Sequence, residues 1–98
     1  MDREYTLIDN EEAKQYEFHI DGFVPRIEYM KAGDKIYLTH TEVTRGLEGK
    51  GVGGKLVKMV LEDIEQKKLK LVPLCPFVAA YIKRHPEWKR IVTEGVKI

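Results

Sequence analysis

The chain has 98 residues and a formal net charge of +1, with 43% apolar and 34% charged residues. This length accommodates a single domain with one modest core, and the composition is that of a globular protein. No apolar run approaches the roughly 18 residues of a membrane span, and the first residues, Met1-Asp2-Arg3-Glu4-Tyr5, do not resemble a signal peptide. We therefore expect one domain over residues 1–98 that makes no contact with a membrane.

Cysteine and histidine usage narrows the class of protein further. Cys75 is the single cysteine, which excludes an internal disulfide and suits a reducing cytoplasm. A zinc site would need a cluster of ligands, and Cys75 does not form one with the scattered His19, His40 and His85. We expect a cytoplasmic protein without a metal site.

The charges are distributed unevenly along the chain. Residues 1–30 carry eight acids and three bases, a net charge of −5, whereas residues 31–98 carry fourteen bases and eight acids, a net charge of +6. The basic part favours a polyanionic ligand. We do not expect nucleic acid as a partner, because a pI near 7.8 is below that of strongly basic nucleic-acid-binding domains.

Alternation of apolar and polar residues predicts four strands, over residues 4–9, 15–21, 24–31 and 35–43. Short turns separate them, so the strands should form an antiparallel meander. In the second strand, alternation places Tyr16, Phe18 and Ile20 on one face, which should be buried, and Glu17 and His19 on the other. In the fourth, it predicts one face with Ile36, Leu38, His40 and Glu42 and another with Tyr37, Thr39, Thr41 and Val43.

The apolar period then changes to that of a helix over residues 52–67, with Val52, Leu56, Val57, Val60, Leu61 and Ile64 on its inner face. A short strand over residues 69–72 follows. Pro76 suits the first turn of a second helix, which makes Cys75 its expected N-cap and places its end near Arg84. His85 precedes Pro86, which disfavours a helical backbone at His85 and should end the helix there. Trp88 and Ile91 should pack the C-terminal segment against the rest of the domain. The order β-β-β-β-α-β-α predicts an α+β fold with a mixed sheet.

Gly49, Gly51, Gly53 and Gly54 stand in a turn that opens directly into the first helix. Glycine allows positive φ and leaves amide N–H groups uncovered, and the first N–H groups of a helix have no internal partner. With the helix dipole, these features predict a site for the diphosphate of a nucleotide-containing cofactor. A glycine-rich turn that only caps the helix is the plainer alternative.

Three known motifs are similar to this segment. A P-loop would need a hydroxyl residue where Leu56 stands, and a dinucleotide site would need an acid about 20 positions further on, whereas residues 66–85 contain none. The third motif is the [QR]-x-x-G-x-[GA] signature of the GNAT superfamily of acetyl-CoA-dependent acyltransferases, which Gly51 and Gly53 match. Glu48 stands where Gln or Arg is usual, and we expect its side chain to point into solvent or toward Lys50.

Four segments in the right order extend the resemblance to the minimal, roughly hundred-residue GNAT-like proteins and a GNAT-like fold. They are His40-Thr41-Glu42-Val43, residues 49–53, residues 72–78 and His85-Pro86-Glu87-Trp88. The resemblance implies a diphosphate on the amides of residues 50–55 and a pantetheine arm between splayed fourth and fifth strands, near Glu42 and Val43. The cofactor-binding residues that it implies for acetyl-CoA are Val43, Gly49, Lys50, Gly51, Val52, Gly53, Gly54 and Lys55.

Acetyl transfer also needs a nucleophile and a base. Cys75, at a helix N-terminus that favours thiolate, is the candidate nucleophile, as in the proteins it resembles; a buried, inert thiol is the alternative. Glu42 and His40 are the candidate bases. The alternatives are that Glu42 is a solvated carboxylate at the end of the strand and that His40 is a hydrogen-bonded strand histidine. Tyr81 could protonate the leaving thiolate, but we expect it to pack in the core. We expect His85 to form a structural corner before Pro86.

The resemblance implies a small acetyl-CoA-dependent N-acetyltransferase that acts on an unidentified amine. We expect a monomer or weak dimer. A CoA-binding module without efficient transfer is the alternative, because so short a chain leaves little material for an acceptor pocket. An interaction domain that uses the basic face is a third interpretation. Stabilisation by CoA separates the first two from the third, and turnover with an amine separates the first from the second.

Overall fold

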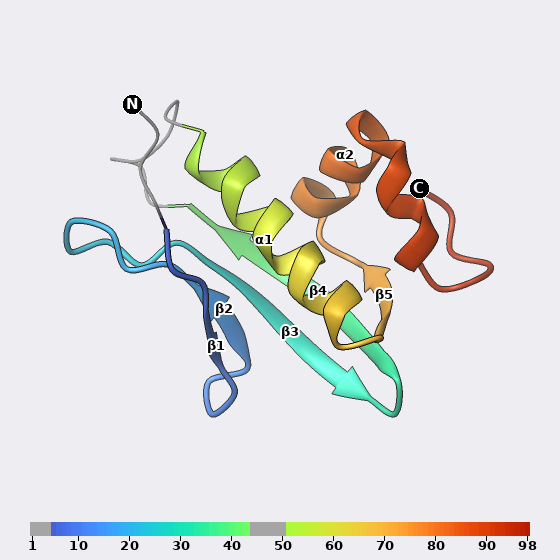
Figure 1. Cartoon of the computed structure of the whole chain (residues 1–98), viewed down its shortest axis with the longest axis horizontal. Helices are drawn as coiled ribbons and strands as arrows, with labels where there is room; N and C mark the ends of the chain where they lie inside the picture. Colours follow the sequence, from blue (N-terminus) through green and yellow to red (C-terminus); the bar gives the residue numbers. More distant parts are fainter. Residues whose placement is uncertain (1–4, 44–50) are drawn as a thin grey trace.

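The computed structural model describes residues 5–43 and 51–98, so the predictions for Glu48, Gly49 and Lys50 lie outside the described residues. The described strands form one five-stranded sheet in the order β1-β2-β3-β4-β5 (Figure 1). These are β1 (Ile8–Asn10), β2 (Gln15–Glu17), β3 (Arg26–Ala32), β4 (Lys35–Glu42) and β5 (Lys70–Pro73). The described helices are α1 (Val52–Gln66), α2 (Pro76–Arg84) and the 3₁₀ helix η2 (Pro86–Ile91).

The sheet is a meander with one parallel strand added. Strands β1 to β4 pair antiparallel with their neighbours, and β5 pairs parallel to β4 after the crossover through α1. The predicted order β-β-β-β-α-β-α and the α+β class are therefore confirmed. The first two strands are shorter than predicted, because the ladder stops at Glu17 and residues 18–25 form a separate tight turn with the Ile20–Phe23 bridge.

Helix α1 provides much of the core. Its six buried residues are those that the helical period predicts: Val52, Leu56, Val57, Val60, Leu61 and Ile64. Burying one such side chain contributes roughly 1.5–3 kcal/mol. Together with Ile27, Tyr29, Ile36 and Leu38 of the sheet, they form a single hydrophobic cluster. Helix α1 lies across one face of the sheet (Figure 1), and both α1 and α2 contribute buried residues to this cluster. The other face of β3 and β4 carries exposed residues such as Met30 and His40.

A polar network joins the C-terminal end of α1 to the sheet. The Tyr16 hydroxyl donates a hydrogen bond to Asp63 over 2.7 Å, and the Tyr29 hydroxyl donates one to Asp9. Lys67 bridges both acids, at 2.9 Å from Asp9 and 2.7 Å from Asp63. Burial opposes ionisation of Asp9, but the hydrogen bonds from Tyr29 and Lys67 outweigh it, so the pKa of Asp9 falls below its usual value.

A β-bulge in β4 overturns one prediction. Tyr29 pairs with Leu38, but Glu28 pairs with His40, so Thr39 is an extra residue in β4. Paired residues share a face, and Thr41 therefore lies on the helix-covered face with its partner Ile27. His40 and Glu42 lie on the opposite, uncovered face. The predicted common face for Ile36, Leu38, His40 and Glu42 is wrong beyond Leu38.

A buried carboxylate also departs from simple alternation. Glu17 is only 6% exposed although its strand neighbours Tyr16 and Phe18 are buried as well. Its side chain accepts hydrogen bonds from Gln15 over 2.6 Å and pairs with His19 over 2.7 Å. These two contacts, against the opposing effect of burial, hold the pKa of Glu17 below its usual value. Glu17 thus stays ionised at neutral pH beneath the surface of the uncovered face.

Candidate active site

Strands β4 and β5 diverge at one end of the sheet. Their last pair is Leu38 with Pro73, and the amides of Leu74 and Cys75 then both donate to the Leu38 carbonyl over 3.0 Å. Beyond this point the chain after β5 turns into α2, while β4 continues through Thr39–Glu42 without pairing to β5. Past the divergence β4 has no strand paired on its β5 side, so the backbone groups that point to this side could pair with a bound molecule.

Cys75 and Thr41 lie on either side of this divergence. Cys75 is the N-cap of α2, as predicted, with extended backbone angles (φ −79°, ψ 125°) and no hydrogen bond from its side chain to the helix amides. Its Sγ lies 3.0 Å from the Thr41 Oγ1. Cys75 is 4% exposed, so its thiol is nearly inaccessible to solvent in this structure. Sequence reasoning missed Thr41, because alternation without the bulge places it on the other face.

His40 and Glu42 lie together, but away from Cys75. His40 Nε2 is 3.4 Å from Glu42 Oε2, and both side chains are 54% exposed. Across the ladder they face a second pair, Arg26 and Glu28, whose side chains are 3.0 Å apart. The structure thus brings the two predicted bases into contact with each other on the uncovered face, and places the predicted nucleophile on the other face.

The start of α1 has the features of an anion site. Gly51 is the N-cap with φ +72°, a left-handed conformation that side chains disfavour. No side chain caps the helix and no acid occupies its first turn. Since the first intrahelical bond runs from the Lys55 amide to the Gly51 carbonyl, the amides of residues 52–54 have no acceptor within the helix. Val52 is buried and Lys55 exposed, so Val52 can contribute only backbone to a ligand.

Gly53 has a packing role that sequence reasoning did not identify. A Cβ at this position would lie 2.6 Å from the Phe77 Cζ and 3.3 Å from the Val43 Cγ2. Gly53 therefore lets the first turns of α1 and α2 approach each other beside the end of β4. Gly54 is near Tyr81, whose ring a Cβ would meet at 3.9 Å. Of the predicted binding residues, Gly53 thus lies beside Val43, just past the end of β4, and Gly54 lies beside Tyr81 of α2.

Tyr81 and His85 are packed against each other, with ring centroids 4.3 Å apart. Tyr81 is 8% exposed, and burial, followed by the charges of Glu87 and Glu62, raises its pKa, so the phenol stays protonated at neutral pH. His85 is both the C-cap of α2 and the residue before η2, as expected of a corner before proline. Core packing of Tyr81 and the corner at His85 agree with the predictions.

Comparison with known proteins identifies the family. The model of the GCN5-related N-acetyl-transferase family matches residues 15–91, which is most of the chain. This protein belongs to the GCN5-related N-acetyltransferase family. The family and the fold together support an N-acetyltransferase.

A solved structure supports the same fold. The solution structure of a GCN5-like candidate N-acetyltransferase from Staphylococcus aureus matches with a TM-score of 0.70 and 24% sequence identity, over 90% of this chain and 87% of that one. None of the curated proteins compared with the chain matches it. In residues 5–43 and 51–98, no helix is long and apolar enough to cross a membrane. Those same ranges contain no group of three or more His, Cys, Asp or Glu side chains placed to hold a metal ion.

Proposed function

We propose that this chain is an acetyl-CoA-dependent N-acetyltransferase that acts on an amine, with residues 1–98 working as one domain. One observation carries the proposal: β4 and β5 diverge after Leu38 and Pro73, beside the glycine-rich start of α1. The open edge of β4 then suits the amides of a pantetheine arm. The amides at the start of α1 suit a diphosphate.

The residues at the start of α1 fit acetyl-CoA as a substrate. Gly51 leaves open space around its Cα, the first turn carries no acid, and exposed Lys55 adds a positive charge. Val43 follows the last residue of β4, and a Cβ at Gly53 would lie 3.3 Å from its Cγ2. These residues would hold the diphosphate and the arm, and Gly49 and Lys50 of the same motif are proposed to complete the site.

In the proposed reaction the amine nitrogen attacks the thioester carbonyl carbon. The C–N bond forms as the C–S bond breaks, the Glu42 carboxylate accepts the proton that the amine loses, and the departing sulfur takes a proton from solvent. His40, 3.4 Å from Glu42, is placed to orient this carboxylate or to accept the proton from it. Because both side chains lie on the uncovered face, the amine would approach from that face.

We infer direct transfer rather than an acetylated cysteine. Cys75 is 4% exposed and lies on the helix-covered face, away from the two bases that could remove its proton. A covalent route would have the Cys75 sulfur displace CoA and then pass the acetyl group to the amine. In the direct route Cys75 and Thr41 line the divergence between the strands and keep β4 and α2 at a fixed spacing.

A coupled assay tests the proposal against a binding module. Release of free CoA thiol is measured with acetyl-CoA alone and with a panel of amines, alongside the melting temperature with and without acetyl-CoA. An acetyltransferase shows a higher melting temperature and amine-dependent thiol release. Stabilisation without release would indicate a CoA-binding module, and no stabilisation at all would contradict the proposed site.

A further inference from the structure

The uncovered face of the sheet is acidic at the end that carries the proposed base. Strand pairing aligns Glu17, Arg26 and Glu42 in one row across β2, β3 and β4. Arg26 is the single base of this row, and its guanidinium is 3.0 Å from Glu28, which neutralises it. With histidine counted as neutral, the carboxylates of Glu17 and Glu42 therefore leave this end with a net charge of −2. Such a potential attracts an ammonium group.

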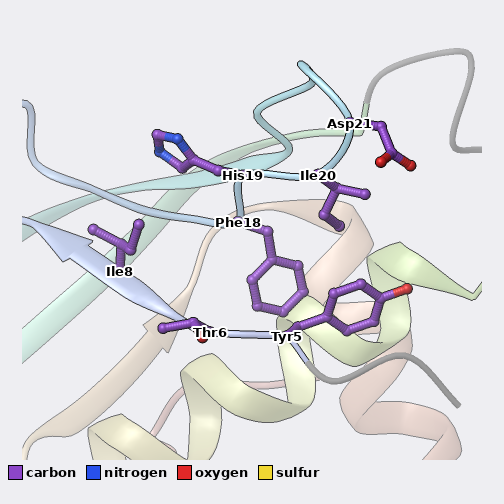
Figure 2. A pocket seen from close by; sticks show the side chains of 7 residues that line it. All are labelled: Tyr5, Thr6, Ile8, Phe18, His19, Ile20 and Asp21. Atoms are coloured by element: carbon purple, nitrogen blue, oxygen red, sulfur yellow. The ribbon is translucent and has the colours of Figure 1, made fainter.

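His19 extends the acidic end to the far side of β2. Its Nε2 lies 2.7 Å from Glu17 Oε1. Figure 2 shows Phe18 and His19 pointing in opposite directions, with the Phe18 ring beside Tyr5 and the His19 ring away from both. His19 therefore lies on the same side of β2 as Glu17, whereas Phe18 is buried in the core.

The opposite end of the uncovered face is basic. Lys35 pairs with Lys70 across β4 and β5, and the next pair, Ile36 with Leu71, is buried on the helix-covered side. Like charges on paired residues of adjacent strands repel each other and destabilise the sheet. In the described part of the chain, neither lysine forms an ion pair with an acid. A carboxylate bound between the two ammonium groups would relieve this repulsion.

An apolar strip separates the acidic end from the basic end. Met30 pairs with Tyr37, which in turn pairs with Val72, so the three side chains share the uncovered face. Met30 is 60% exposed, and the other two are half-buried. A flexible, exposed methionine adapts to apolar groups of different shapes. The strip therefore suits the apolar middle of a ligand whose two ends are charged.

The distance between the charged ends sets the length of such a ligand. Arg26, which pairs with Glu42, and Ala32, which pairs with Lys35, are six positions apart in β3. Six steps along a strand cover about 20 Å. An extended peptide of about six residues spans the same distance, whereas a compact amine cannot reach both ends.

We propose that the acceptor is the N-terminal amine of an extended peptide that lies along the uncovered face. Its amine lies at Glu42, and an acidic side chain about six residues further on binds Lys35 and Lys70. The inference rests on the proposed function, because it names the class of the acceptor. The peptide nitrogen forms its bond to the acetyl carbonyl carbon as the C–S bond of the thioester breaks, and its proton passes to Glu42. An α-amino group has a pKa of about 7.7–8.0, against about 10.4 for a lysine side chain, so it gives up its proton more readily to a carboxylate.

Binding is measured without acetyl-CoA, so that the uncovered face is tested apart from catalysis. The probe is the peptide Ala-Ala-Leu-Ala-Ala-Glu with a free N-terminus and an amidated C-terminus, and the matched control peptide ends in Gln. Both are titrated into the isotope-labelled protein while amide NMR shifts are recorded. We expect shifts along β3, β4 and the start of β5, and binding of the Gln peptide that is weaker by about threefold or more, as for the loss of exposed ion pairs. Equal affinity for the two peptides, or shifts centred on the helices, would overturn the proposal.

Charge reversal at the two lysines is the decisive test. Lys70→Glu leaves one charge of each sign at the basic end and should abolish the preference for the Glu peptide over the Gln peptide. The double variant Lys35→Glu/Lys70→Glu should bind a peptide that ends in Lys more tightly than the Glu peptide. Lys58→Glu makes the same change at an exposed position of α1, on the other side of the sheet, and should keep the wild-type preference. If the double variant also keeps that preference, the proposal is wrong.

The two proposals fail in distinguishable ways. If other amines are acetylated but the Glu peptide has the same kcat/KM as the Gln peptide, the peptide proposal is wrong and the acetyltransferase stands. If the peptides bind with the expected preference but no amine is acetylated, the proposed function is wrong, and the acceptor role of the peptide is wrong with it.

Discussion

The Thr41 hydroxyl oxygen lies 3.0 Å from the Cys75 sulfur, although 34 positions separate the two residues in the sequence. The contact depends on the bulge at Thr39, which turns Thr41 toward α2, and on the end of β5 at Pro73, which directs the chain toward β4. It joins β4 to the N-terminus of α2 just beyond the last pair of the β4–β5 ladder. The contact therefore lies on the helix-covered side of the divergence, opposite the face that carries His40 and Glu42.

The role of Cys75 is tested by removing its sulfur. Under direct transfer, Cys75→Ala binds acetyl-CoA as wild type does and retains acetyl transfer within about tenfold, since the base and the amides at the start of α1 are unchanged. Intact-mass spectrometry of wild type incubated with acetyl-CoA should show no acetyl adduct. An adduct that disappears in Cys75→Ala, together with loss of transfer, would establish the covalent route instead.

The role of Glu42 is tested by a variant that keeps its shape. Glu42→Gln should lower kcat by about 100-fold or more, because positioned general bases contribute roughly 10²–10⁴-fold. Binding of acetyl-CoA, followed by the melting temperature, should not change. The matched control is Glu28→Gln, an acid on the same face that is two strand positions away and outside the proposed proton path. Equal activity of Glu42→Gln and wild type would exclude Glu42 as the base.

The diphosphate site is tested by a pair of substitutions at Gly51. Gly51→Asn and Gly51→Asp impose similar strain at φ +72°, because both residues tolerate this conformation better than other side chains do. They differ in charge. A ligand at a hundredfold excess over its Kd stabilises a protein by about 2.7 kcal/mol, and we expect Gly51→Asn to keep most of this stabilisation by acetyl-CoA and Gly51→Asp to lose it. Equal stabilisation of the two variants would place the phosphates elsewhere.

The packing role of Gly53 is tested by a double-mutant cycle with Phe77. Gly53→Ala adds a methyl group 2.6 Å from the Phe77 ring, and we expect it to lower the free energy of unfolding by about 1 kcal/mol, near the lower limit for overpacked sites. The ring is 42% exposed and can move in part, whereas the Val43 methyl at 3.3 Å is held by the end of β4. In the Phe77→Ala background the same substitution should cost less than half as much. Additive effects would show that the ring does not require the glycine.

The network of Asp9, Asp63 and Lys67 predicts how stability depends on pH. The folded pKa of Asp9 is lowered, so its contribution is complete above the usual value of 3.8 and is lost as pH falls through the lowered pKa. Lys67 is partly desolvated, but its bonds to Asp63 and Asp9 raise its pKa above 10.5, so its contribution is lost only as pH rises through that raised value. Denaturant unfolding of Lys67→Met should give a lower free energy of unfolding between these limits, and this free energy should fall less steeply below pH 4. If it depends on pH below 4 as it does in wild type, the assigned network is wrong.

Much of the fold could be predicted from the sequence, because its signals are local. The helical period of α1, the proline at the start of α2 and the alternation in β3 each involve residues close together in the chain. The bulge in β4 could not be predicted in this way. The segment Thr39-His40-Thr41-Glu42 is polar throughout, so neither face is marked by an apolar residue and both registers fit the pattern equally well.

The candidate site was predictable in part for the same reason. The glycines at the start of α1 and the N-cap position of Cys75 follow from local sequence. The Thr41–Cys75 contact, the contact of Gly53 with Phe77 and the burial of Glu17 depend on tertiary packing between distant segments. Glu17 could not be recognised as buried, because its partners Gln15 and His19 appear in the sequence only as ordinary polar residues of an alternating strand.

The most direct test of the account is to identify the product of the reaction. Isotope-labelled acetyl-CoA is incubated with catalytic amounts of the protein and an amine, and the amine is analysed by mass spectrometry over several turnovers. The account predicts a labelled amide that accumulates with time, in wild type and far more slowly in Glu42→Gln. If acetyl-CoA binds but no labelled amide forms with any amine of a broad panel, the protein is not an N-acetyltransferase, and the divergence of β4 and β5 serves only to hold the cofactor.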